Sequence, residues 1–256
     1  MNPKTLSVIG FLCSCMRPEE DAFGGALWAY YNDGENFEII EREDGYFGAI
    51  ETRAYFTTYE EWPPFEQKAL GFAKGRVLDV GCGAGRHALY LQEKGLDVVG
   101  IDNSPLSIEV CRLRGLKKTQ VVSIEEVDYP PNSFDTVLML GNNFGLFGSF
   151  ERARQLLSGF HMITSEDALI IAGTRDVYGT ENPDHLEYQR LNREKGRMSG
   201  QVRIRVRFHK CVTKWFDYLM VSKSEMEEIL EGTGWKVQEH LDSEGSNYIA
   251  IIGKAD

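Results

Sequence analysis

The sequence predicts an α/β fold built on an open parallel sheet, because strands and helices alternate along the middle of the chain. Residues 76–91 read R-V-L-D-V-G-C-G-A-G-R-H-A-L-Y-L, where an apolar run, three glycines and helically spaced apolar residues follow one another. This is the pattern of a strand, a tight turn and a helix. A second strand is expected at residues 97–101, and further apolar runs at 135–140 and 168–172 continue the alternation.

The glycine turn at residues 81–85 predicts a ligand site at the carboxyl end of the first strand. A chain that turns at once from strand to helix needs unusual dihedral angles and room for a ligand against its backbone. Asp79 lies just before the glycines, where an open parallel sheet places its ligand crevice. A carboxylate there suits an ammonium group or hydroxyls and repels phosphates. Asp102 lies about twenty residues beyond the glycines, the spacing of an acid that binds ribose hydroxyls.

Three motifs of the chain resemble those of one enzyme family. D-V-G-C-G-A-G-R and G-I-D-N-S-P resemble the first two motifs of the class I (Rossmann-like) S-adenosylmethionine-dependent methyltransferases. Residues 132–140, N-S-F-D-T-V-L-M-L, are similar to the fourth strand of that family and to the segment that leads into it. The dinucleotide-binding fold has a similar turn and downstream acid, and Asp79 favours the methyltransferase over that alternative.

The resemblance implies a doubly wound, seven-stranded, mostly parallel sheet with an antiparallel last strand, plus a small α+β cap. It implies S-adenosyl-L-methionine as the cofactor and S-adenosyl-L-homocysteine as the product. The chain departs from the family where an aspartate and a small residue often hold the adenine, since Ser123 and Ile124 stand there. The residues that the resemblance assigns to the cofactor are Asp79, Gly81, Cys82, Gly83, Gly85, Asp102, Asn103, Ile124, Glu125, Leu140 and Asn142, and no metal is expected.

The rest of the chain is expected to supply a cap and the end of the sheet. The predicted divisions are a terminal segment (1–16), an N-terminal extension (17–65), the methyltransferase core (66–173), an inserted cap (174–221) and a final helix and hairpin (222–256). In the family, such extensions commonly fold over the cofactor and help to form the substrate pocket.

Turn and capping residues delimit the remaining elements. Asn32-Asp33-Gly34 ends a first helix that starts near Arg17. Ser104 and Pro105 open a helix over 106–114, and Ser222 with Glu225 forms a capping-box sequence for a helix over 223–231. The other expected elements are helices at 65–73, 150–163 and 186–195 and strands at 37–41, 45–50, 119–124, 201–208, 212–221, 235–241 and 247–253.

The composition is that of an ordinary globular protein with an acidic balance. A formal net charge of -11 and a pI near 5.0 disfavour nonspecific binding to nucleic acid or anionic membranes. Five scattered cysteines lack the paired spacing of a zinc site and are expected to be reduced thiols in a cytoplasmic protein. The apolar residues 6–15 are too few to span a bilayer and are expected to be an ordinary terminal segment or to precede a natural start at Met16; a lipoprotein-type signal is the alternative.

The inserted cap carries the candidate catalytic and docking groups. A methyl acceptor that must lose a proton needs a base, and His185 and His209 are the two candidates expected near the active site. Residues 190–214 hold nine basic residues against the single acid Glu194. The arginines 203, 205 and 207 share one face of an alternating strand, which either pairs with the acidic N-terminal extension or docks an anionic metabolite or an RNA.

The expected function is methyl transfer to an oxygen or nitrogen of a small-molecule acceptor, which the basic residues allow to be anionic. One alternative is an RNA-modifying methyltransferase that docks through the basic face of residues 190–214. The other is a cofactor-binding protein without turnover, because no catalytic base is assured. No membrane partner is expected, and the pattern of residues does not predict an oligomeric state.

Overall fold

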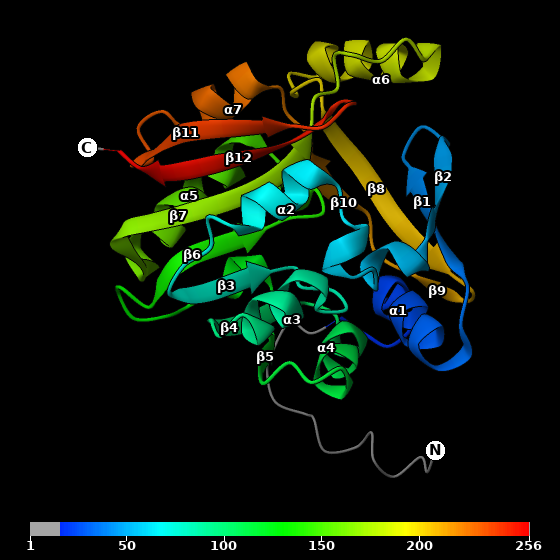
Figure 1. The fold of residues 1–256 in the computed structure, drawn as a ribbon. Helices are drawn as coiled ribbons and strands as arrows, with labels where there is room; N and C mark the ends of the chain where they lie inside the picture. Colours follow the sequence, from blue (N-terminus) through cyan, green and yellow to red (C-terminus); the bar gives the residue numbers. More distant parts are fainter. Residues whose placement is uncertain (1–15, 256) are drawn as a thin grey trace.

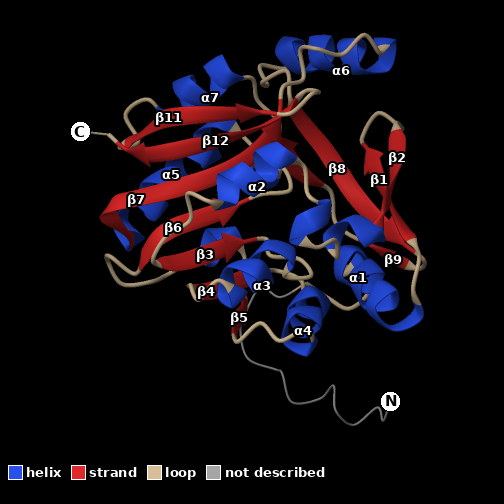
Figure 2. Ribbon diagram, viewed as in Figure 1, coloured by secondary structure: helices blue, strands red, loops and turns tan. Residues whose placement is uncertain are grey.

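The computed structural model describes residues 16–255, which form two β-sheets with helices around them (Figure 1; Figure 2). The larger sheet has seven strands in the order β11-β12-β7-β6-β3-β4-β5. Their bounds are β3 (Arg76–Val80), β4 (Asp97–Asp102), β5 (Lys118–Val121), β6 (Phe134–Met139), β7 (Thr164–Arg175), β11 (Trp235–Asp242) and β12 (Asn247–Lys254). Strands β3 to β7 pair in parallel, and β12 runs antiparallel to β7 and β11. The predicted seven-stranded sheet with an antiparallel last strand is confirmed.

Both faces of this core sheet are covered by helices, because its central strands are apolar on both sides. The covering helices include α3 (Arg86–Glu93), α4 (Pro105–Leu113), α5 (Phe150–Ile163) and α7 (Lys223–Leu230). One buried cluster joins Val137 of β6 with Leu157 of α5, and another joins its neighbour Leu138 with Ile108 of α4. Each such side chain contributes about 1.5–3 kcal/mol when it is removed from water. The sheet is therefore a rigid support for the loops at its carboxyl edge.

The predicted capping box at α7 is present. The Ser222 hydroxyl accepts a hydrogen bond from the Glu225 amide at 3.3 Å, and the Glu225 carboxylate accepts one from the Ser222 amide at 2.8 Å. The Trp235 indole, at the start of the final hairpin, donates to the Leu157 carbonyl at 2.9 Å. The capping box closes the start of α7, and the Trp235 bond ties the final hairpin to α5.

A second sheet, here called the cap sheet, joins two distant parts of the chain. Its strands are β1 (Phe37–Arg42), β2 (Phe47–Glu51), β8 (Gln201–Phe208), β9 (Cys211–Val212) and β10 (Phe216–Leu219), and all pairings are antiparallel. Strand β1 lies between β2 and β8, so the N-terminal extension and the inserted segment complete one sheet. Figure 1 shows this sheet beyond the carboxyl ends of β3 and β6.

The cap sheet has an inner and an outer face, which the alternation along its strands defines. The inner face carries Glu38, Arg42, Val202, Val206 and Tyr218; all but Tyr218 are buried, and Tyr218 is partly buried. Helix α1 (Ala22–Asp33) packs on this face, where the Phe208 ring approaches within 3.5 Å of a Cβ position at Gly25. The outer face carries Glu41 and the three arginines of β8. The sheet therefore turns its buried side toward α1 and the core.

Three predicted strands are clearly wrong in length. The strand expected at 212–221 is divided into β9 and β10, because Thr213 bonds back to Val206 through both its amide and its hydroxyl. The strand expected at 119–124 ends at Val121, and the chain then turns into the 3-10 helix η4 (Ile124–Glu126), where the Ser123 hydroxyl accepts from the Glu125 amide. In contrast, β7 extends beyond the predicted 168–172.

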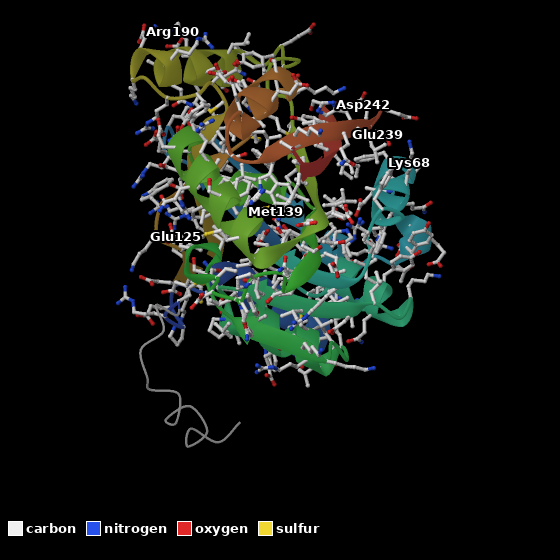
Figure 3. The ribbon with its side chains drawn as sticks, turned by 90° about the vertical axis from the view of Figure 1, so that its left-hand side faces the viewer. Lys68, Glu125, Met139, Arg190, Glu239 and Asp242 are labelled. Atoms are coloured by element: carbon white, nitrogen blue, oxygen red, sulfur yellow. The ribbon has the colours of Figure 1, made fainter. Side chains whose placement is uncertain are left out.

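Further helices lie between the two sheets and around them. They are η2 (Thr52–Tyr55), η3 (Tyr59–Glu61), α2 (Pro64–Leu70), η5 (Asn143–Phe147) and α6 (Pro183–Glu194). Lys68 of α2 and Glu239 of β11 lie close together in Figure 3, and their side chains pair at 2.6 Å. Helix α6 lies at the top of Figure 1, away from α3 and α4. None of the helices within residues 16–255 is both long and apolar enough to cross a bilayer.

Candidate cofactor site

The turn between β3 and α3 adopts the left-handed backbone that its glycines permit. Gly81, Gly83 and Gly85 have φ values of +70°, +54° and +77°. The amides of Gly81 and Cys82 both donate to the Ile101 carbonyl, at 2.9 and 3.0 Å, so the turn is fastened to β4. Gly85 then caps the start of α3. The turn leaves its backbone close to the end of β4, where Asp102 stands.

Asp102 is already oriented by the glycine turn. Its carboxylate accepts hydrogen bonds from the Gly83 amide at 3.0 Å and the Ser104 amide at 2.9 Å. Burial raises the pKa of this carboxyl to about 6, against the lowering effect of these backbone bonds, and Asp21 also raises it. A carboxylate fixed in this way can accept two further hydrogen bonds from a pair of hydroxyls.

Asp79 has the clearest feature of a ligand-binding residue. Its side chain is 3% exposed, and its Oδ2 atom has no hydrogen-bond partner among residues 16–255. Burial, and to a lesser degree the nearby Asp102 carboxylate, raises the pKa of Asp79 to about 7, although a backbone hydrogen bond from Ala88 opposes this. A buried carboxylate oxygen without a donor is costly. A ligand with an ammonium group would supply the donor and the opposite charge.

The loop after β6 closes over the glycine turn through Asn143, a residue that sequence reasoning missed. Its side-chain amide donates to the carbonyls of Val80 and Gly81, both at 2.9 Å. The neighbouring Asn142, predicted to bind the cofactor, has φ +67° and accepts a hydrogen bond at its carbonyl from the Tyr218 hydroxyl. In the sequence, this contact was indicated only by the two adjacent asparagines after the strand. The sequence did not show which of the two faces the glycine turn.

Helix α1 covers the glycine turn from the N-terminal side. Asp21 caps this helix and bonds the start of α4, since its carboxylate accepts from the Gly24 amide at 3.0 Å and the Ser104 hydroxyl at 2.7 Å. The first turn of α1 carries Phe23. Its ring lies 3.7 Å from the position that a Cβ atom would take at Gly83. The predicted folding of the extension toward the ligand site therefore has a specific form, in which Asp21 fixes α1 to α4.

The other predicted cofactor residues have varied surroundings, and their roles stay predictions. Cys82 is buried with its sulfur 3.7 Å from that of Cys111, and the contact with Cys111 together with burial raises the pKa of the Cys82 thiol. Leu140 is buried, Asn103 is exposed, and Ile124 lies on η4. Glu125 is exposed and pairs with Arg152 at 2.7 Å.

The two candidate catalytic histidines lie far apart along the cap. His185 lies on α6, where its ring packs edge-on against Tyr46 at 4.8 Å. His209 is exposed at the β8–β9 turn with φ +49°. Neither contacts the glycine turn in the described part of the chain, and their catalytic roles stay predictions. Within residues 16–255 there is also no group of three or more His, Cys, Asp or Glu side chains that could hold a metal ion.

The arginine face of β8 is paired rather than free. Arg205 makes a two-point salt bridge with Glu41 at 2.8 and 2.9 Å, and Arg207 pairs with the same carboxylate. Arg203 contacts Asp217 at 3.2 Å. The two arginine hydrogen bonds hold the pKa of Glu41 at about 2. This arrangement agrees with the interpretation in which the arginines neutralise acids of the extension.

The parallel sheet, its glycine turn and the two buried acids at adjacent strand ends together define a site of the class I methyltransferase type. Comparison with known proteins agrees. Residues 77–166 match the family model described as a methyltransferase domain. The structure of a SAM-dependent methyltransferase from Bacteroides fragilis, solved in complex with S-adenosyl-L-homocysteine, is similar with a TM-score of 0.82 and 28% identity over 95% of this chain and 98% of that chain.

The curated relatives match part of this chain and part of their own length. An S-adenosyl-L-methionine-dependent Diels-Alderase from Talaromyces variabilis is 30% identical over 173 residues, which are 56% of this chain and 54% of that protein. A glycine/sarcosine N-methyltransferase from Aphanothece halophytica is 30% identical over 107 residues, or 40% of each protein. The chain thus spans about half the length, or less, of these curated relatives. Residues 77–166 are a methyltransferase domain, and the fold and the site are those of the class I S-adenosylmethionine-dependent methyltransferases, as the sequence motifs predicted.

The residues present fit the cofactor of this family, S-adenosyl-L-methionine. The unpartnered oxygen of Asp79 suits its ammonium group, and the fixed carboxylate of Asp102 suits its ribose hydroxyls. Both acids lie in a buried site that favours a cationic ligand over a phosphate-bearing one.

We expect cofactor binding to weaken at low pH. The folded-state pKa values of Asp79 and Asp102, about 7 and about 6, lie above their ordinary value, so both carboxylates gain protons as the pH falls through this range. A protonated carboxyl is a poor partner for an ammonium group, so affinity for S-adenosylhomocysteine should fall about tenfold between roughly pH 7.5 and pH 5.5. Calorimetric titration across this range measures the effect, and an Asp79→Asn variant should flatten the profile. A constant affinity in the wild type would contradict the assignment.

Proposed function

We propose that the protein transfers a methyl group from S-adenosyl-L-methionine to an oxygen or nitrogen of a small-molecule acceptor. The observation that carries the proposal is the buried, unpartnered Asp79 oxygen beside the fixed Asp102 carboxylate, under a cover formed by α1 and the cap sheet. A site whose acids are buried in this way admits a small acceptor more readily than a folded macromolecule.

Each part of the site has a separate task in this proposal. When bound, the cofactor supplies an activated methyl group on a positively charged sulfur. Asp79 and Asp102 would hold its ammonium and ribose groups, and Asn143 keeps the glycine turn and the β6 loop together. Phe23 and Tyr218 limit access of water from the cap side. Alignment in such a dry site accounts for much of the acceleration, up to about 7–11 kcal/mol in ideal cases.

The RNA-modifying alternative has less support than the small-molecule function. Its docking face was to be the arginine strand, but Arg205 and Arg207 already share the Glu41 carboxylate. RNA phosphates would have to compete with this pairing, and the net charge of -11 works against their approach.

Transfer of a labelled methyl group tests the proposal. Cofactor carrying a tritiated methyl group is incubated with the protein and a panel of small amines, hydroxyl compounds and carboxylates, with bulk RNA as a separate sample. We expect label in at least one small-molecule fraction, and a loss of at least about tenfold in the Asp79→Asn variant. Label in RNA would favour the alternative. Cofactor binding without label in any fraction of a broad panel would favour a protein without turnover.

A further inference from the structure

A second buried carboxylate with an unpartnered oxygen lies on the inner face of the cap sheet. Glu38 of β1 is 1% exposed. Its Oε1 atom accepts a hydrogen bond from the Tyr55 hydroxyl at 2.7 Å, whereas its Oε2 atom has no partner among residues 16–255. Burial raises the pKa of Glu38 to about 7, although the bond from Tyr55 opposes this. The side chain is thus held at one oxygen and open at the other.

Glu38 is connected to the cofactor site through Tyr55. The Tyr55 ring packs edge-on against Phe23 at 5.0 Å, and the Phe23 ring in turn lies 3.7 Å from a Cβ position at Gly83. The Phe23 side chain therefore lies between Tyr55 and the glycine turn. Glu38 lies on the cap side of that turn, opposite the core sheet.

Tyr218 connects the same region to the loop after β6. It shares the inner face of the cap sheet with Glu38. It also lies close enough to Tyr55 to add to the rise in the Tyr55 pKa that burial and Glu38 mainly cause. The Tyr218 hydroxyl donates to the Asn142 carbonyl, and its ring packs so closely on Gly145 that a Cβ there would lie 2.2 Å from it. Glu38 and Tyr55 thus lie next to side chains that contact the glycine turn, through Phe23, and the β6 loop, through Tyr218.

Packing alone gives no reason for a carboxylate at this position. An unpaired buried carboxylate destabilises a fold unless a partner neutralises it. Glu41, three residues along the same strand, faces outward and has two arginine partners. Arg42, the cation on the inner face of β1, is paired with Asp44 at 2.7 and 2.8 Å. Glu38 has no such ion pair in the described part of the chain, so its open oxygen points to a ligand.

We propose that Glu38, held by Tyr55, forms the acceptor side of the active site and receives a hydrogen-bond donor of the acceptor. The acceptor therefore presents an amine, an ammonium or a hydroxyl group beside the methyl position, and a carboxylate or phosphate is excluded from that end. Tyr55 is a positioning residue. The inference rests on the proposed function, because it assumes that the cofactor lies between the glycine turn and α1.

Sinefungin tests this placement without a known acceptor, because it carries an ammonium group where the cofactor carries its methylsulfonium. Titrations measure its affinity and that of S-adenosylhomocysteine for the same variants. In Glu38→Gln we expect sinefungin affinity to fall about tenfold and S-adenosylhomocysteine affinity to change less than about twofold. Glu41→Gln, the matched change on the opposite face of β1, should leave both affinities at the wild-type values.

The outcomes separate this inference from the proposed function. An unchanged ratio of the two affinities in folded Glu38→Gln protein would overturn the role of Glu38. If the wild type binds neither ligand, the proposed function itself fails. Should Glu38→Gln not fold, Tyr55→Phe removes the hydroxyl that orients the carboxylate, and it should lower the sinefungin preference by a smaller factor. No change in that variant would also count against the inference.

Discussion

Replacing Asp102 with alanine is expected to weaken binding of S-adenosylhomocysteine about a hundredfold or more. The carboxylate is fixed by the Gly83 and Ser104 amides, so it is preorganised for the two ribose hydroxyls. Hydrogen bonds to charged groups contribute about 1.5–3 kcal/mol each, and two of them exceed the 2.8 kcal/mol, roughly, that separates affinities by a hundredfold. Calorimetric titration of the wild type and the variant gives both dissociation constants.

A control for this variant lies at the other end of the same strand. Asp97 begins β4, is exposed and pairs with Lys118 at 2.7 and 2.9 Å. Asp97→Ala should bind the ligand as the wild type does, because exposed ion pairs contribute about 0–1 kcal/mol to stability and lie outside the site. If Asp102→Ala also retains affinity within about threefold, Asp102 does not hold the ribose.

A Gly81→Ala variant is expected to lose both stability and cofactor affinity. Gly81 has φ +70°, and a Cβ there would lie 2.7 Å from the Asn143 amide and 2.9 Å from Leu146. The left-handed backbone costs a non-glycine residue about 1–2 kcal/mol, and the contact with Asn143 must open as well. We expect a loss of about 2–4 kcal/mol in the free energy of unfolding, which urea denaturation measures.

Gly95 provides the matched control, since it isolates the backbone cost. It has φ +89°, and a Cβ there would meet nothing within 4 Å. Gly95→Ala should lose only about 1–2 kcal/mol and keep the wild-type affinity for S-adenosylhomocysteine. Equal losses in the free energy of unfolding of the two variants would show that the contact between the glycine turn and Asn143 does not contribute to stability.

The arrangement of the candidate cofactor residues could be predicted because these residues are close in sequence or fixed by strand order. Asp79 and the glycines belong to one continuous turn, and Asp102 ends the next strand. In a parallel sheet these strand ends meet at one edge without further information. The capping box at Ser222 was predicted for the same reason, since both of its partners lie within four residues.

The proposed acceptor side could not be predicted, because its contacts join distant segments. Glu38 was part of a short strand in the sequence, and nothing there indicated that it would be buried beside Tyr55. The arginines of β8 showed a basic face, but their partner Glu41 lies 164 residues from Arg205. Pairings of this kind depend on tertiary structure, in which β1 inserts between β2 and β8. The alternating pattern predicted β8 and its basic face, and pairing with the acidic extension was one of two interpretations, but the partner residue Glu41 was not predicted.

Strand lengths were the other point at which local patterns failed. The apolar residues of 212–221 suggested one strand, yet the hydrogen bonds of Thr213 to Val206 end the pairing early. Side-chain hydroxyls that bond to the backbone compete with a regular ladder. The interruption has a consequence for the site, because β10 then restarts in the register that places Tyr218 on the Asn142 loop.

Titration of S-adenosyl-L-methionine into the wild-type protein at about pH 7.5 tests the central claim most directly, since both buried acids are then largely able to ionise. We predict saturable binding with one site per chain and a dissociation constant in the micromolar range, about -8 kcal/mol. An absence of binding to S-adenosyl-L-methionine and S-adenosyl-L-homocysteine, in protein that circular dichroism shows to be folded, would contradict the account.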